Sequence, residues 1–252
     1  MKLLLTALTL FLACLSLPSA GAADLTCFEL RTYYASEGKL DALNSRFRDH
    51  TMALFEKHGM TNLIYWVPQE NESNTLVYLL AYPDKAAREA SWKAFLADPV
   101  WVAAKDASEA NGKLVTKVES LFLSLTGYSP ALPIKAGKAP RLFEMRRYTT
   151  LPGKLEALDA RFRDHTVTLF AKHGMENILY FHLDDGQEGS DSTLLYFLAH
   201  ESAGAQTASF DAFREDPAWI TARDASERDG KLLIEKGVAA TLLKATDYSP
   251  AK

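Results

Sequence analysis

The chain has 252 residues, of which 48% are hydrophobic and 24% charged, and its formal net charge is −4 at pH 7. This composition is typical of globular domains and excludes a disordered or fibrous chain. Charges of both signs are interspersed without a basic block, so we expect neither nucleic acid nor an anionic membrane surface as a partner.

The first 23 residues have the pattern of an export signal. A charged start is followed by the apolar run Leu3–Leu17 and by small residues up to Ala23. We therefore predict that residues 1–23 are removed and that the mature protein is periplasmic or extracellular. Lipoprotein processing at Cys14 is the alternative. Removal of the signal leaves Cys27 as the one cysteine, which excludes an internal disulfide.

The mature chain is predicted to begin with a strand over residues 27–34, because polar and apolar side chains alternate there. One face carries Phe28, Leu30 and Thr32, and the other carries Glu29, Arg31 and Tyr33. An amphipathic helix is predicted next, with Leu40, Leu43, Phe47, Leu54 and His58 on one face. Gly59 is expected to end this helix.

A hairpin, two helices and a closing strand are predicted to complete the unit. The hairpin pairs residues 62–67 with 75–82, a helix covers residues 86–96, a short helix begins at Asp98-Pro99, and the last strand covers residues 113–126. Aspartate followed by proline is typical of a capped helix start.

The whole unit occurs twice. Phe28–Met60 and Phe143–Met175 align without a gap at a constant offset of 115 (143 − 28), and both copies end in Tyr-Ser-Pro. We therefore predict two domains, residues 24–130 and 141–252, joined by a proline-containing linker over residues 131–140.

The order β-α-β-β-α-β with one added helix predicts an α+β protein with two tandem ferredoxin-like domains. Such a sheet carries helices on one face only. We expect the bare face of each sheet to be covered by the other copy, which makes the chain an intramolecular pseudo-dimer. The bare face carries either Phe28 and Leu30 or the more polar set of Glu29, Arg31 and Tyr33.

The residues also carry a family resemblance. The matching motifs in the first copy are Glu29-Leu30-Arg31-Thr32-Tyr33, Gly38-Lys39-Leu40, Arg46-Phe47-Arg48-Asp49-His50, Lys57-His58-Gly59-Met60, Asp98-Pro99-x-Trp101 and Tyr128-Ser129-Pro130, with counterparts in the second copy. The chain resembles the NIPSNAP family, whose fold belongs to the dimeric α/β barrel group. The resemblance implies that fold but no established reaction, and related barrels include haem-dependent enzymes and cofactor-independent monooxygenases.

His50 and His165 are the candidate catalytic residues. The helical wheel places His50 beside Leu43 and Phe47, so its ring is expected to point toward the sheet. In related barrels the space between sheet and helices holds haem or substrate, which makes these histidines candidates for an axial ligand or a general base. The alternative is a half-buried histidine that protein groups satisfy.

Two further sets of polar residues have simpler interpretations. His58 and His173 are expected in the last turn of a helix, and the eight residues between His50 and His58 exclude a shared zinc ion. Arg46 and Asp49, at i, i+3 spacing, are interpreted as surface charges.

Glu29, Arg31 and Tyr33, with Glu144, Arg146 and Tyr148, are the candidate ligand-binding residues. We expect them where the sheets meet, either in ion pairs between the domains or around a polar ligand.

The absence of GxSxG, GxGxxG, Walker and CxxC motifs favours a binding or scaffold module for a small molecule or a protein, without cofactor or metal. Further homo-oligomerisation is left open. The alternative function is a haem-binding or monooxygenase-like enzyme.

Overall fold

The computed structural model describes residues 25–134, 137 and 141–252. The predicted export signal and Cys14 lie outside these residues, as does part of the predicted linker. The elements of the first half are β1 (Cys27–Ala35), α1 (Leu40–Arg46), a π-helical turn (Phe47–Thr51), α2 (Met52–Lys57), β2 (Thr61–Pro68), β3 (Thr75–Tyr82), α3 (Lys85–Ala97), α4 (Pro99–Ser108) and β4 (Val115–Leu125). The predicted element order of this half is therefore confirmed.

The second half repeats this order. Its elements are β5 (Leu142–Thr150), α5 (Leu155–Arg161), a π-helical turn (Phe162–Thr166), α6 (Val167–Lys172), β6 (Glu176–Leu183), β7 (Thr193–His200), α7 (Ala203–Glu215), α8 (Pro217–Ser226) and β8 (Leu233–Ala245). Gly59 and Gly174 follow α2 and α6 with φ of 79° and 78°, the left-handed conformation that ends a helix. None of the helices in the described part of the chain is long and apolar enough to cross a membrane.

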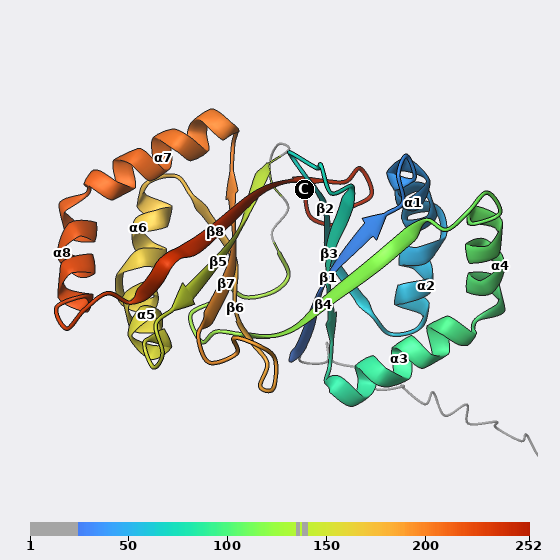
Figure 1. The fold of residues 1–252 in the computed structure, drawn as a ribbon, viewed down its shortest axis with the longest axis horizontal. Helices are drawn as coiled ribbons and strands as arrows, with labels where there is room; N and C mark the ends of the chain where they lie inside the picture. The colour runs from blue at the N-terminus through green and yellow to red at the C-terminus, as the bar shows by residue number, and fades with distance from the viewer. Residues whose placement is uncertain (1–24, 135–136, 138–140) are drawn as a thin grey trace, which may run out of the picture.

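The strands of both halves form one closed barrel in the order β1-β3-β2-β8-β5-β7-β6-β4. Figure 1 shows the strands in the middle, α1 to α4 on one outer side and α5 to α8 on the other. The two sheets face each other as expected, and they form the barrel that the family resemblance implied because β4 pairs with β6 and β2 pairs with β8. This pairing joins the sheets at both edges and leaves no exposed sheet edge.

The barrel interior is filled by apolar side chains from both halves. Phe28 of β1 lies 5.3 Å from Phe181 of β6, measured between ring centroids, and the Trp66 indole stacks on Phe197 at 5.0 Å. Leu132 and Ile134, from the predicted linker, also pack on this cluster. The interior is therefore an apolar core that both halves share.

The Phe28 and Leu30 face of β1 points into this core, and Glu29, Arg31 and Tyr33 point toward the helices of their own half. The expectation that the polar set lies where the sheets meet, in ion pairs between the domains, is therefore wrong. A dry apolar interior would leave these charges without hydrogen-bond partners, whereas α3 supplies partners on the other face.

Each Tyr-Ser-Pro end lies on the opposite half. Tyr128 donates a hydrogen bond to Asp159 of α5 at 2.6 Å, and Tyr248 donates one to Asn44 of α1 at 2.7 Å. The Ser249 hydroxyl accepts a hydrogen bond from the backbone N–H of Tyr65 at 3.0 Å. The repeated tripeptide thus ties the two halves together reciprocally.

Candidate functional site

A pocket of about 330 Å³ lies between the sheet and the helices of the first half. Its walls come from β1, the end of α1, the π-helical turn, α2, α3, α4 and the start of β4. It is lined by Tyr33, Arg46, Phe47, Thr51, Phe55, Trp92, Phe95, Leu96, Trp101, Lys105, Glu109, Lys113, Val115 and Val118. The second half has a pocket at the equivalent place, of about 200 Å³.

The π-helical turn shapes one wall of this pocket. The Thr51 hydroxyl donates to the backbone carbonyl of Arg46, five residues earlier, at 3.1 Å, and Thr166 does the same with Arg161. This wider turn inserts one extra residue and advances the helix phase relative to a regular α-helix. Phe47 and Thr51 therefore face the pocket.

His50 and His165 are exposed and line neither pocket. The expectation that the His50 ring points toward the sheet is wrong, because the extra residue of the π-helical turn rotates it into solvent and places Thr51 on the buried face. These histidines therefore do not fit the role of an axial haem ligand in the pocket.

Arg46 is the buried charge that the sequence interpretation missed. It is 5% exposed, and its guanidinium donates to Glu109 at 3.0 Å and lies 5.2 Å from the Trp101 ring centroid. Its Nε has no hydrogen-bond partner among the described residues, and neither has Nε of its counterpart Arg161. The interpretation of Arg46 as a surface charge paired with Asp49 is therefore wrong, since Asp49 pairs with Arg48.

Aromatic side chains form the floor of the pocket. The Phe55 ring lies 4.8 Å from Phe95 and 5.4 Å from Trp92, and Phe95 lies 4.4 Å from Trp101. The two Phe55 contacts are edge-to-face, at interplanar angles of 63° and 66°, and the Phe95–Trp101 contact is tilted by 35°, so the rigid rings hold one another in place. The floor is therefore preformed.

Behind the Trp92 wall lies a buried ionic network around Glu29. The Glu29 carboxylate is fully buried and accepts two hydrogen bonds from Arg88, at 2.8 and 3.0 Å, and one from Arg31. Trp92 and Tyr82 also donate to it, each at 3.2 Å. Burial alone would raise the pKa of Glu29, but the hydrogen bonds from Arg88 and the positive charge of Arg31 outweigh burial and lower it below 4.5.

Of the predicted ligand-binding residues, Tyr33 and Tyr148 line the pockets, and the glutamates and arginines lie behind the walls. Arg31 donates to the Tyr33 hydroxyl at 3.4 Å, and its guanidinium lies 4.3 Å from the Trp92 ring centroid. Arg31 and Glu29 therefore position two walls of the pocket.

The second half keeps this network with different partners. Glu144 pairs with Arg146 at 2.5 Å and with the buried His200 at 3.0 Å, and Gln206 stands where the first half has Arg88. Burial alone would raise the pKa of Glu144, but the hydrogen bond from His200 and the charge of Arg146 lower it.

His58 and His173 connect helices, as expected for structural residues. His58 lies 2.7 Å from the Asp98 carboxylate, which also caps α4 through the Val100 N–H at 2.9 Å. His173 and Asp216 repeat this arrangement. Hydrogen bonds from Lys57 and His58 hold the pKa of Asp98 well below its usual range.

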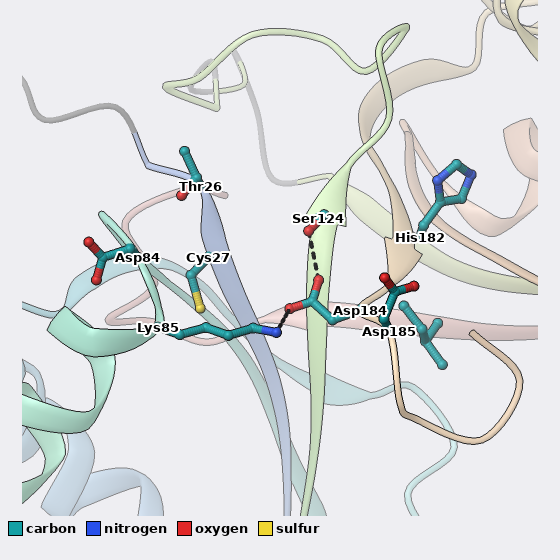
Figure 2. Close-up of a pocket in the computed structure, with 9 residues that line it drawn as sticks. Thr26, Cys27, Asp84, Lys85, Ser124, His182, Asp184 and Asp185 are labelled. Atoms are coloured by element: carbon teal, nitrogen blue, oxygen red, sulfur yellow. Dashed lines mark hydrogen bonds and ion pairs between the residues drawn. The ribbon is translucent and has the colours of Figure 1, made fainter. Parts of the chain in front are cut away.

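A larger cavity, of about 480 Å³, lies at the seam between the halves (Figure 2). Asp184 receives an ion pair from Lys85 at 3.1 Å and a hydrogen bond from Ser124 at 2.6 Å. Asp84 caps α3, and the His182 ring points away from Cys27 and binds Asp159. The polar groups of this cavity thus hold the seam together, and the second half has no equivalent among the described cavities.

No group of three or more His, Cys, Asp or Glu side chains is placed to hold a metal ion within residues 25–134, 137 and 141–252.

The fold is similar to that of solved barrels of low sequence identity. A putative monooxygenase from Lactobacillus acidophilus has 12% identity and a TM-score of 0.55, covering 87% of this chain and 94% of that one. A putative chlorite dismutase has 12% identity and a TM-score of 0.52, covering 89% of this chain and 96% of that one. At this identity the likeness concerns the fold alone.

Sequence comparison identifies the family. An uncharacterized NIPSNAP domain protein from Burkholderia xenovorans has 24% identity and a TM-score of 0.37, and it covers 42% of this chain and 99% of its own length. No curated protein matches the sequence. The NIPSNAP family model matches residues 28–130 and again residues 143–250, so the chain belongs to the NIPSNAP family, as a tandem of two such domains.

Proposed function

We propose that this protein is an exported binding module that holds a small amphipathic molecule in the pockets between its sheet and its helices. The observation that carries the proposal is a pocket with an aromatic floor and a buried arginine, found at the same place in both halves. The proposal also treats each half as a ferredoxin-like unit and the chain as a fused version of a two-chain barrel.

The size and lining of the first pocket support binding. Its volume of about 330 Å³ falls in the range of small-molecule sites, which combine apolar walls with a few polar groups. π-helical turns are often found at functional sites, and one borders each pocket.

The lining residues favour binding over catalysis. The first pocket is lined by no histidine or cysteine of the described chain, and its one carboxylate, Glu109, is paired with Arg46. Histidine, cysteine and unpaired carboxylates are the commonest general bases and nucleophiles, and the lining supplies none of them, whereas its lysines and aromatic rings suit the binding of an amphipathic anion.

A monooxygenase-like activity is the second candidate, and the barrel similarity over 87% of the chain favours it. It would be supported if oxygen consumption with 1-naphthol followed the protein concentration and fell when Trp92 is replaced by phenylalanine. If the wild-type protein consumes no oxygen with 1-naphthol, monooxygenase activity on this substrate is contradicted.

Binding is tested with the fluorescent anion 8-anilinonaphthalene-1-sulfonate. We expect saturable fluorescence enhancement in the wild type, and loss of it when Val118, which lines the first pocket and is 43% exposed, and Leu233, which lines the second, are both replaced by tryptophan. Val102→Trp is the matched control, because Val102 is 44% exposed and lines neither pocket. Unsaturable binding, or equal binding in the double variant, would contradict the proposal.

A further inference from the structure

We propose that the two pockets are not equivalent: the first half binds an organic monocarboxylate with a flat apolar body, and the second half does not. This inference rests on the proposed binding function. It adds the ligand class and the residues that determine specificity.

Size separates the two pockets first. The first pocket measures about 330 Å³ and the second about 200 Å³, which lies below the usual range of small-molecule sites. Val115 lines the first pocket and Leu233 the second, and they occupy equivalent positions because they pair with Ala35 and Thr150. The larger leucine side chain narrows the second pocket.

The aromatic wall also differs between the two pockets and favours binding in the first. The Trp92 indole lines the first pocket, and hydrogen bonds to Tyr82 at 2.9 Å and Glu29 at 3.2 Å fix its orientation. Phe210 takes its place beside Arg146, at 4.5 Å, and does not line the second pocket. The first pocket therefore offers a flat ligand an oriented indole at a position where the second pocket has no lining ring.

The pocket mouths differ in polarity. Leu96, at the mouth of the first pocket, is 57% exposed although it is a large apolar side chain. Arg214 occupies the corresponding position in α7 and pairs with Asp211 at 2.8 Å. Contact with an apolar ligand would bury the exposed surface of Leu96 and stabilise the complex, whereas the solvated Arg214–Asp211 pair offers no apolar surface of this kind.

Charge defines the head group of the ligand. Arg46, Lys105 and Lys113 line the first pocket against the single carboxylate of Glu109, which leaves two positive charges in excess. Lys113 forms no ion pair with any residue in the described ranges. In the second pocket Arg223 pairs with Asp224 at 2.7 Å. A ligand carboxylate at the Lys113 end would be matched by this excess charge.

The test is isothermal titration of the mature chain with 1-naphthoate and with its neutral analogue 1-naphthylmethanol. We expect one 1-naphthoate site per chain and weaker binding of the alcohol. Lys113→Gln should weaken 1-naphthoate binding about 3- to 10-fold, the effect of one partly exposed charge, and leave the alcohol unchanged. Lys113 is exposed, so this substitution does not endanger folding.

The size difference is tested at the two equivalent positions that line the pockets. Val115→Leu should weaken 1-naphthoate binding in the first half, and Leu233→Val should leave the stoichiometry at one, because the second pocket still lacks the Trp92 indole. Two equal sites in the wild type, or equal affinity for the acid and the alcohol, would overturn the inference and leave the binding function intact. If neither 1-naphthoate nor 8-anilinonaphthalene-1-sulfonate binds, the proposed binding function itself is wrong.

Discussion

Arg46 is buried whereas its neighbours Arg48, Asp49 and His50 are exposed, and Glu29 is buried among arginines. Charged side chains are rarely buried unless paired, so the sequence favoured a surface position for Arg46. Arg46 is buried because Glu109 and the Trp101 ring, which come from the distant helix α4 and its end, satisfy it. The sequence does repeat the three residues of this contact, because Arg161, Glu227 and Trp219 of the second copy make the same contacts as Arg46, Glu109 and Trp101.

Glu29→Gln tests the buried network at this scale. The substitution removes the negative charge opposite Arg31 and Arg88, so we expect the free energy of unfolding to fall by about 3 kcal/mol in chemical denaturation at pH 7. Glu37→Gln, at an exposed position, should change it by less than about 0.5 kcal/mol. A loss below about 1 kcal/mol for Glu29→Gln would contradict this account.

The stability difference between the wild type and Glu29→Gln should depend on pH. The pKa of Glu29 is lower in the folded protein than its ordinary value of 4.5, so its ionised form stabilises the fold above that pH. As the pH falls below about 4.5, this stabilisation decreases until Glu29 is protonated in the folded state. The stability difference between wild type and Glu29→Gln should therefore be constant near neutral pH and shrink below about pH 4.5. A difference that widens on acidification would show the opposite sign of shift.

At the scale of elements, the strands and helices followed from periodicity and caps, and the π-helical turn did not. Alternation predicted β1, and Asp98-Pro99 predicted the start of α4. The helical wheel failed over residues 47–51 because it assumes 3.6 residues per turn throughout, and the Thr51 hydroxyl bond to the Arg46 carbonyl stabilises a wider turn.

Thr51→Val tests this turn. The valine keeps the side-chain shape and removes the hydroxyl donor, so we expect a loss of about 1 kcal/mol in the free energy of unfolding. Thr168→Val, at an exposed position of α6, serves as the control and should be close to neutral. Equal effects of the two substitutions would argue that the hydroxyl does not support the turn.

Ser249→Ala tests the reciprocal Tyr-Ser-Pro ends. It removes the acceptor of the Tyr65 backbone N–H, which is buried, so unfolding should become easier by about 1–3 kcal/mol. Ser73→Ala, in an exposed turn, provides the baseline in the same denaturation experiment. A neutral Ser249→Ala variant would mean that the end of the chain contributes little to the union of the halves.

At the scale of the whole molecule, the repeat predicted a pseudo-dimer and the family resemblance predicted a barrel, but neither identified the strands that close it. Internal similarity shows that two copies are present and that one sheet face must be covered. Which strand edges meet depends on the pairing of β4 with β6 and of β2 with β8, which connects residues far apart in the sequence. The resemblance indicated a binding space between sheet and helices, but its lining could not be identified from the sequence because the residues come from seven elements.

Trp66→Ala tests the shared core. Trp66 is fully buried and stacks on Phe197 of the other half, so its removal should lower the free energy of unfolding by about 3–5 kcal/mol. We expect far-ultraviolet circular dichroism and the fluorescence of Trp219, measured with Trp92 and Trp101 replaced by phenylalanine in both proteins, to report the same shifted transition. Separate transitions for the two halves would contradict a core held in common.

We place the 1-naphthoate site in the pocket of the first half, and titration of two matched variants distinguishes this pocket from its counterpart in the second half. Val118 and Val238 are each 43% exposed and pair with Tyr33 and Tyr148 at equivalent positions. We predict that Val118→Trp abolishes the single binding site and that Val238→Trp retains it. Loss in both variants, or unchanged binding in Val118→Trp, would contradict the claim.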